Sequence, residues 1–170
     1  AYKKVRSLRS LLVRSCLSPN SDKEALPPGT YPCHRGRCNT CAYVANTTTF
    51  EGPSSSSWRV SQHITCTSTS VIYAIRCKRC SKIYVGETKR RLADRTTEHI
   101  RSIRLNMDGF PVAQHFNSAS HTISDFEISG LAAGFKTDEE RKTKEEKLIF
   151  RLGSTHPNGL NVTFYSFPIN

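Results

Sequence analysis

The chain has 170 residues, with 25 lysine or arginine against 14 aspartate or glutamate residues, so its net charge is +11 at neutral pH. This length suits one domain of ordinary size with at most a small appended module. The short apolar run Leu11–Val13 is far too short for a membrane span or a secretory signal, so no membrane partner is expected. Because the chain begins at Ala1, we expect it to be a piece of a longer protein.

The first 70 residues divide into two segments. Residues 1–30 begin as a basic, weakly amphipathic stretch that predicts a helix over 1–16, and they end in a Pro- and Ser-containing linker. Residues 31–70 are rich in Cys, Ser and Thr and poor in large apolar residues. Such a segment cannot build a hydrophobic core of its own, so something else must order it.

Two β-branched and aromatic runs, Val71–Ile75 and Ile83–Val85, predict a β-hairpin whose turn is rich in Arg, Lys and Ser. Each strand carries one tyrosine, Tyr73 or Tyr84, so the hairpin can present two phenols together. Gly86 is then expected to open a helical segment. Residues 76–104 hold ten basic and three acidic side chains, and a stripe of this density favours phosphate backbones over a merely solvated face.

The later part of the chain predicts further helices and strands. Pro111 starts a helical turn, and Phe126–Ile128 predicts a strand. Thr137 and Glu140 form a capping box at the start of a charged helix, and Leu160–Val162 predicts a closing strand. From residue 71 onward these elements predict an α+β fold, with a small three-stranded antiparallel sheet flanked by helices.

Helical periodicity separates two neighbouring carboxylates in the charged helix. Glu145 shares a face with Leu148 and Leu152, whereas Glu146 points about 100° away. An ionised carboxylate on a packed face is costly unless a cation or a donor meets it. We therefore single out Glu145; an ion pair with Arg141 is the purely structural alternative. In the preceding basic helix, His99 falls on the apolar stripe, with Arg95 at its flank.

Five short motifs follow one another in order from residue 71. They read Val71-Ile72-Tyr73, Tyr84-Val85-Gly86, Arg95-x-x-x-His99, Glu145-x-x-Leu148-Ile149 and Gly159-Leu160-Asn161. In this order they resemble the GIY-YIG nuclease family, with Val71 in place of the first glycine. The Cys-x-x-Cys pair between the two tyrosine motifs, the Pro111–Phe116 segment before His121 and the upstream Cys38-x-x-Cys41 also resemble the endonuclease domain of Penelope-like retroelements. In those elements it follows a reverse transcriptase in one polyprotein.

The resemblance implies a metal-dependent DNA endonuclease that nicks its target for target-primed reverse transcription, so the site of action would be nuclear. Glu145 would hold Mg²⁺ or Mn²⁺, and Arg95 would contact the scissile phosphate. Asn161 would position a tyrosine or the phosphate, or would only make a strand-end hydrogen bond. The general base stays open among Tyr73, Tyr84 and His99, because a free tyrosine is a poor base at neutral pH and histidine titrates in the right range.

The cysteines and histidines are expected to bind two Zn²⁺ ions. One set is Cys33, Cys38, Cys41 and Cys66, and the other is Cys77, Cys80, His115 and His121. An alternative set joins Cys38 and Cys41 to Cys77 and Cys80, leaving the two histidines to packing or DNA contact. Cys16 is left over as a plain thiol.

The expected organisation is a basic linker over 1–30, a zinc-bound extension over 31–70 and a nuclease core over 71–170. Expected partners are double-stranded DNA and the attached reverse transcriptase, with RNA of the element left open. A catalytically inactive zinc-dependent nucleic-acid-binding module is the main alternative, and a zinc-stabilised scaffold is another. The expected phosphate contacts are Lys89, Arg90, Arg91, Arg101 and Arg104.

Overall fold

The computed structural model describes residues 26–53, 56–118 and 120–162. The predicted helix over 1–16 and the thiol of Cys16 lie outside these residues. Within the described part of the chain, no helix is both long and apolar enough to cross a membrane.

A three-stranded antiparallel sheet forms the centre of the fold, as predicted. Its strands are β5 (Val71–Cys77), β6 (Ile83–Thr88) and β7 (Phe126–Ala133), in the order β6-β5-β7. β6 is therefore an edge strand, and the hairpin of β5 and β6 is confirmed. The expectation that Gly86 opens a helix is wrong, because Gly86 pairs with Tyr73 and the ladder continues to Thr88.

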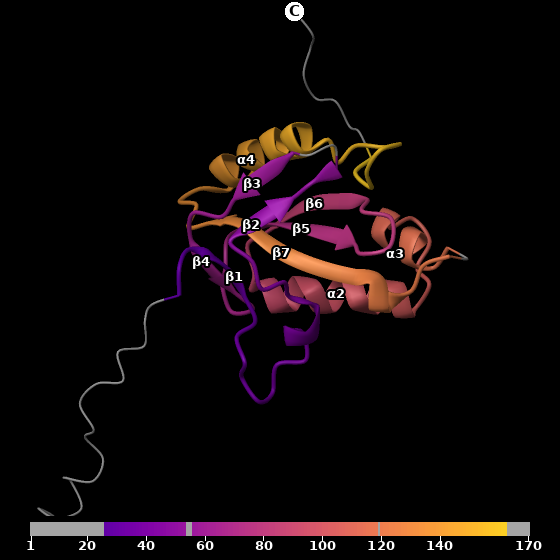
Figure 1. Cartoon of the computed structure of the whole chain (residues 1–170), viewed down its shortest axis with the longest axis horizontal. Helices are drawn as coiled ribbons and strands as arrows, with labels where there is room; N and C mark the ends of the chain where they lie inside the picture. The colour runs from indigo at the N-terminus through magenta and orange to yellow at the C-terminus, as the bar shows by residue number, and fades with distance from the viewer. Residues whose placement is uncertain (1–25, 54–55, 119, 163–170) are drawn as a thin grey trace, which may run out of the picture.

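Helices cover both faces of this sheet (Figure 1). α2 (Leu92–Arg104) and the short α3 (Pro111–Phe116) pack on the face that carries Tyr73 and Ile75. α4 (Asp138–Leu152) packs through Leu148 on the opposite face, with Ile72. The described residues also include the 3₁₀ turns η2 (Cys41–Tyr43) and η4 (Ile123–Asp125).

The predicted cap of α4 forms in part. The Thr137 hydroxyl accepts a hydrogen bond from the Glu140 N–H at 3.1 Å. The Glu140 carboxylate, however, accepts from the N–H of Lys136 at 3.0 Å rather than from that of Thr137. The predicted closing strand over 160–162 is not formed, since Asn161 makes a single bridge to Thr155.

Residues 29–66 form two small sheets beside β7. β1 (Gly29–Tyr31) runs parallel to β4 (His63–Thr65), and β2 (Thr49–Glu51) pairs antiparallel with β3 (Ser57–Arg59). Ile64 of β4 is fully buried over Gly130, where an added Cβ would lie 2.4 Å from the Ile64 side chain. The few apolar residues of this stretch thus join the core of the main sheet, which orders part of the segment.

Candidate active site and two candidate metal centres

The two tyrosines of the hairpin lie on one face of the sheet, toward α2. Tyr73 is opposite Gly86 and Tyr84 is opposite Ile75, so the two phenols are diagonal neighbours with ring centroids 6.5 Å apart. A Cβ atom on Gly86 would lie 2.6 Å from the Tyr73 hydroxyl oxygen and 2.8 Å from the Tyr84 ring. Only glycine leaves room for both rings at this position.

Arg95 and His99 meet the Tyr73 hydroxyl from the same face of α2. Arg95 Nε donates to Tyr73 Oη at 2.9 Å, and His99 Nε2 lies 2.8 Å from the same oxygen. The His99 ring also packs edge-on against both tyrosine rings, with centroids 5.7 Å away in each case. The i, i+4 spacing of Arg95 and His99 brings the two groups to one phenol.

Burial shifts the pKa values of the two tyrosines and of His99. It raises the pKa of Tyr73 and of Tyr84, against the opposing effect of Arg95. Burial, together with the Arg95 charge, lowers the pKa of His99 to about 3. His99 is therefore a neutral imidazole at physiological pH, and its Nε2 can accept a hydrogen bond from the Tyr73 hydroxyl. Tyr73 is fully buried, whereas Tyr84 is only half-buried and can reach a bound water.

The buried state of His99 predicts a pH-dependent contribution to stability. The unfolded chain protonates His99 below about pH 6.5, whereas the folded protein does so only near 3, so stability falls as the pH falls between these values. His99→Gln stays neutral throughout. We expect the unfolding free energy of the parent, relative to His99→Gln, to decrease by about 2 kcal/mol between roughly pH 8 and pH 5. Urea titrations of both proteins measure this difference, and parallel pH profiles would contradict it.

Glu145 lies half-buried on α4, while Glu146 is exposed, as the helical periodicity predicts. Burial first, and then the negative charges of Glu87 and Glu146, raise the pKa of Glu145 to about 7. In turn, the Glu145 charge contributes to raising the pKa of both Tyr73 and Tyr84, although burial is the main cause for each. A bound cation would stabilise the ionised form of this carboxylate, which burial and the neighbouring negative charges disfavour.

The alternative ion pair between Glu145 and Arg141 is not formed. Among the described residues, no Lys, Arg or His nitrogen lies within 4 Å of the Glu145 carboxylate, while buried Arg141 pairs with Glu87 and Asp138. The pair between Arg141 and Glu87 links α4 to the edge strand β6. Sequence reasoning missed Glu87 as part of the site, although its position directly after the second tyrosine motif was an available signal.

Asn161 holds the edge strand rather than a phenol. Its side-chain amide accepts from the Val85 N–H at 2.8 Å and donates to the Val85 carbonyl at 2.7 Å. The Leu160 N–H also donates to the Ile83 carbonyl at 2.8 Å. The amide therefore pairs with β6 as a neighbouring strand would, and it fixes the backbone next to Tyr84.

The five expected phosphate contacts divide into two groups. Lys89, Arg90 and Arg91 each form an ion pair, with Asp138, Glu98 and Asp94 respectively. Arg101 and Arg104 are exposed in the last turn of α2, and within the described residues neither has a carboxylate within 4 Å. These two arginines are the ones most available to an anionic partner.

Two clusters of sulfur and nitrogen atoms could each hold a metal ion. The first joins Cys33, Cys38, Cys41 and Cys66, and the second joins Cys77, Cys80, His115 and His121, with the ligand atoms of each cluster within 4.8 Å of one another. The structure thus brings together the two expected ligand sets and not the alternative of four cysteines from both regions. Four such ligands suit the tetrahedral preference of Zn²⁺.

The second cluster contains an unpartnered buried atom. Nε2 of His121 is buried with no hydrogen-bond partner among the described residues, while its Nδ1 contacts the hydroxyls of Ser118 and Ser120. Nε2 of His115 lies 3.5 Å from the Cys80 sulfur. A metal ion would satisfy the free nitrogen of His121, so the residues fit the expected group.

A family model for the GIY-YIG catalytic domain matches residues 69–161, which is more than half of the chain. The chain belongs to this family. It is therefore a GIY-YIG nuclease, as its five motifs indicated. The matched residues include the sheet, all of α2 and α4, and Asn161.

Two solved structures are similar to this chain. The catalytic domain of the homing endonuclease I-TevI is 24% identical, with a TM-score of 0.49, over 56% of this chain and 100% of that one. A mutant of the catalytic domain of intron endonuclease I-TevI is also 24% identical, with a TM-score of 0.48, over 58% of this chain and 98% of that one. No curated protein matches the chain.

Proposed function

We propose that this GIY-YIG nuclease is a metal-dependent DNA endonuclease that nicks one strand of a duplex. The observation that carries the proposal is the convergence of Arg95 and His99 on the Tyr73 hydroxyl, together with the half-buried Glu145 carboxylate, whose charge raises the pKa of the same phenol. Phosphodiester hydrolysis needs an oriented water, a cation at the phosphate and stabilisation of the leaving oxygen. These side chains can orient the water, bind the cation and donate hydrogen bonds to the phosphate oxygens.

Each side chain has a role that follows from its surroundings. When bound at Glu145, Mg²⁺ or Mn²⁺ would supply Lewis-acid chemistry and lower the pKa of a coordinated water. Arg95 presents its guanidinium to the phosphate while its Nε holds Tyr73. Half-buried Tyr84 orients the water, while neutral His99 and Arg95 hold the hydroxyl of Tyr73, which stays protonated because it is fully buried.

A nicking assay on supercoiled plasmid tests this function. We expect relaxed circles when Mg²⁺ or Mn²⁺ is added and none when divalent metal is omitted, because Glu145 alone cannot stabilise charge at the phosphorus. Omission is a cleaner control than a strong chelator, which could also strip ions from the two cysteine-containing clusters. Linear product without a nicked intermediate would contradict single-strand cleavage, and metal-independent relaxation would contradict the role given to Glu145.

We further propose that the nick serves target-primed reverse transcription by a reverse transcriptase attached to this domain, with the nucleus as the site of action. The support is the second ligand cluster, since Cys77, Cys80, His115 and His121 are among the features by which the chain resembles the endonucleases of Penelope-like retroelements. A nick leaves a 3′ hydroxyl, which is the group that such a polymerase extends. Both ligand clusters would hold Zn²⁺ in this protein.

The end of α2 should dominate nonspecific DNA affinity. Arg101 and Arg104 have no acidic neighbour to displace, whereas Arg90 and Arg91 are already neutralised by Glu98 and Asp94. Replacing Arg101 and Arg104 with alanine should make the slope of log affinity against log salt shallower by roughly two units. The matched Arg90→Ala/Arg91→Ala protein should change the slope by less. Anisotropy titrations on a labelled duplex at several salt concentrations measure both slopes, and the reverse order would contradict the division.

A further inference from the structure

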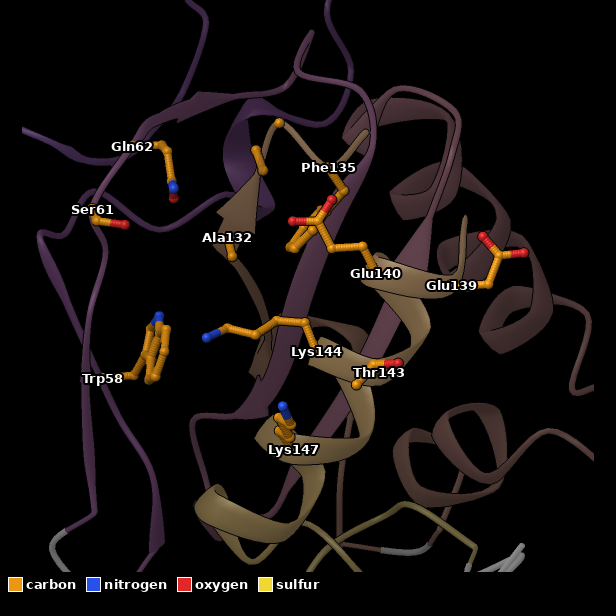
Figure 2. Close-up of a pocket in the computed structure, with 12 residues that line it drawn as sticks. Trp58, Ser61, Gln62, Ala132, Phe135, Glu139, Glu140, Thr143, Lys144 and Lys147 are labelled. Carbon is orange, nitrogen blue, oxygen red and sulfur yellow. The ribbon is translucent and has the colours of Figure 1, made fainter. Parts of the chain in front are cut away.

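A pocket of about 580 Å³ lies between the small sheet of β2 and β3 and the exposed side of α4. Figure 2 shows its walls, with Trp58 on one side and the α4 lysines on the other. Ala132, Ala133 and Gly134 line it with little side-chain bulk. The residues that matter for its chemistry are Trp58, Ser61, Gln62, Phe135, Lys144 and Lys147. Its size is within the usual range for small-ligand pockets.

The Trp58 ring is held in place at the wall of this pocket. Its indole N–H donates to the Leu131 carbonyl at 2.8 Å, which satisfies its one polar atom and ties the ring to β7. The ring itself is only half-buried. Two cations approach it, with Lys144 Nζ 4.7 Å and the Arg151 guanidinium carbon 5.1 Å from the ring centroid. A fixed, accessible aromatic face with nearby cations is a stacking platform.

The cations around this platform are not held in ion pairs within the described residues. Lys144, Lys147 and Arg151 recur at helical spacing along one stripe of α4, and none forms an ion pair among the described residues. Of the two acidic residues at the pocket, Glu140 accepts from the Lys136 N–H, and Figure 2 shows Glu139 directed to the other side of the helix from Trp58. Glu139 and Glu140 balance Lys144 and Lys147 in the lining as a whole, so the positive charge is concentrated at the Trp58 ring, which Lys144 and Arg151 approach.

From this combination we infer that the pocket binds an unpaired nucleotide of single-stranded DNA. The base stacks on Trp58, and the adjoining phosphates contact Lys144 and Lys147, while Ser61 and Gln62 offer hydrogen bonds to the base edge. A cation over an exposed ring is a weaker interaction than a stacked base, so Lys144 can leave the ring and pair with a phosphate. Since every base has a flat face, the pocket would show little preference among sequences.

This site is separate from the nicking site. Glu145 is half-buried on α4 and does not line the pocket, whereas its neighbours Lys144 and Lys147 do. The inference rests on the proposed function only in naming DNA as the polymer, because a nicked duplex frays to a single strand within reach of the enzyme. Strand capture at this pocket would keep the cut end from reannealing.

Trp58 is the single tryptophan of the chain, so its fluorescence reports on this pocket alone. The Glu145→Gln protein, which leaves DNA uncut, is titrated with a short oligothymidylate, a duplex of equal length and the corresponding oligouridylate. We expect the single-stranded DNA to quench Trp58 and the duplex to quench it much less. Lys144→Ala/Lys147→Ala should weaken this binding about tenfold, since two phosphate contacts are lost. The control Lys142→Ala, an exposed lysine of α4 outside the pocket, should leave it unchanged.

The remaining outcomes decide against the inference. Absence of quenching, equal quenching by the duplex, or binding that survives Lys144→Ala/Lys147→Ala would overturn it, and tighter binding of the oligouridylate would reassign the pocket to RNA. The control Lys142→Ala should also nick plasmid at the parent rate. If the parent protein does not nick plasmid, the proposed function is wrong. The fluorescence result would still stand, because the titration requires no cleavage.

Discussion

Replacing Glu145 with alanine should lower the rate of plasmid nicking by roughly a thousandfold or more, because it removes the half-buried carboxylate proposed to hold the catalytic metal ion. The same change at Glu146 should be mild, since that side chain is exposed on the next face of the helix. Arg95→Ala should be as severe as Glu145→Ala, because Arg95 holds Tyr73 and, in the proposed mechanism, would contact the scissile phosphate. Initial rates on supercoiled plasmid at saturating Mg²⁺ measure all three.

Duplex binding separates loss of chemistry from loss of fold in these proteins. Glu145→Ala should bind a labelled duplex nearly as well as the parent, because the carboxylate repels rather than attracts phosphate. An inactive Glu146→Ala beside an active Glu145→Ala would overturn the assignment of the carboxylate. If neither change matters while binding persists, the chain is better described as a nucleic-acid-binding module with an inactive site.

Metal analysis of the purified protein should find about two zinc ions per chain, one for each cluster of four ligands. Cys77→Ser or His121→Ala should reduce this number to about one, since each removes a ligand of the second cluster. A structural zinc contributes on the order of 10 kcal/mol to the segment that it orders, so removing it should strongly destabilise the protein. These variants should also lose nicking, because Cys77 ends the strand that carries Tyr73.

Cys16→Ser is the matched control, because Cys16 belongs to neither expected ligand set. Its zinc content and nicking rate should equal those of the parent. A parent protein with one zinc ion would mean that one cluster is only a group of packed thiols or imidazoles. A parent with none would contradict metal binding at both. Loss of zinc from Cys77→Ser without any loss of nicking would show that the β5–β6 hairpin keeps its active conformation without the ion.

Short-range residue patterns in the sequence were enough to predict much of the fold and the positions of several candidate site residues. The tyrosine hairpin, the shared face of Arg95 and His99, and the choice of Glu145 over Glu146 follow from periods of two or 3.6 residues along one strand or helix. These periods depend on backbone geometry alone, so they can be read without knowing what packs against each element. The family motifs have the same local character and lie in the expected order.

Contacts between distant segments were decided only by the tertiary structure. The pairing of Asn161 with Val85, the link between Glu87 and Arg141, and the closure of each ligand cluster join residues far apart in sequence. Spacing could not choose between the two partitions of the cysteines, because a zinc ion accepts any four ligands that the fold brings within reach. Nor could composition reveal that Ile64 packs into the main core, since burial depends on the space left above Gly130. A periodic pattern specifies which way a side chain faces, and only the assembled fold specifies what it meets there.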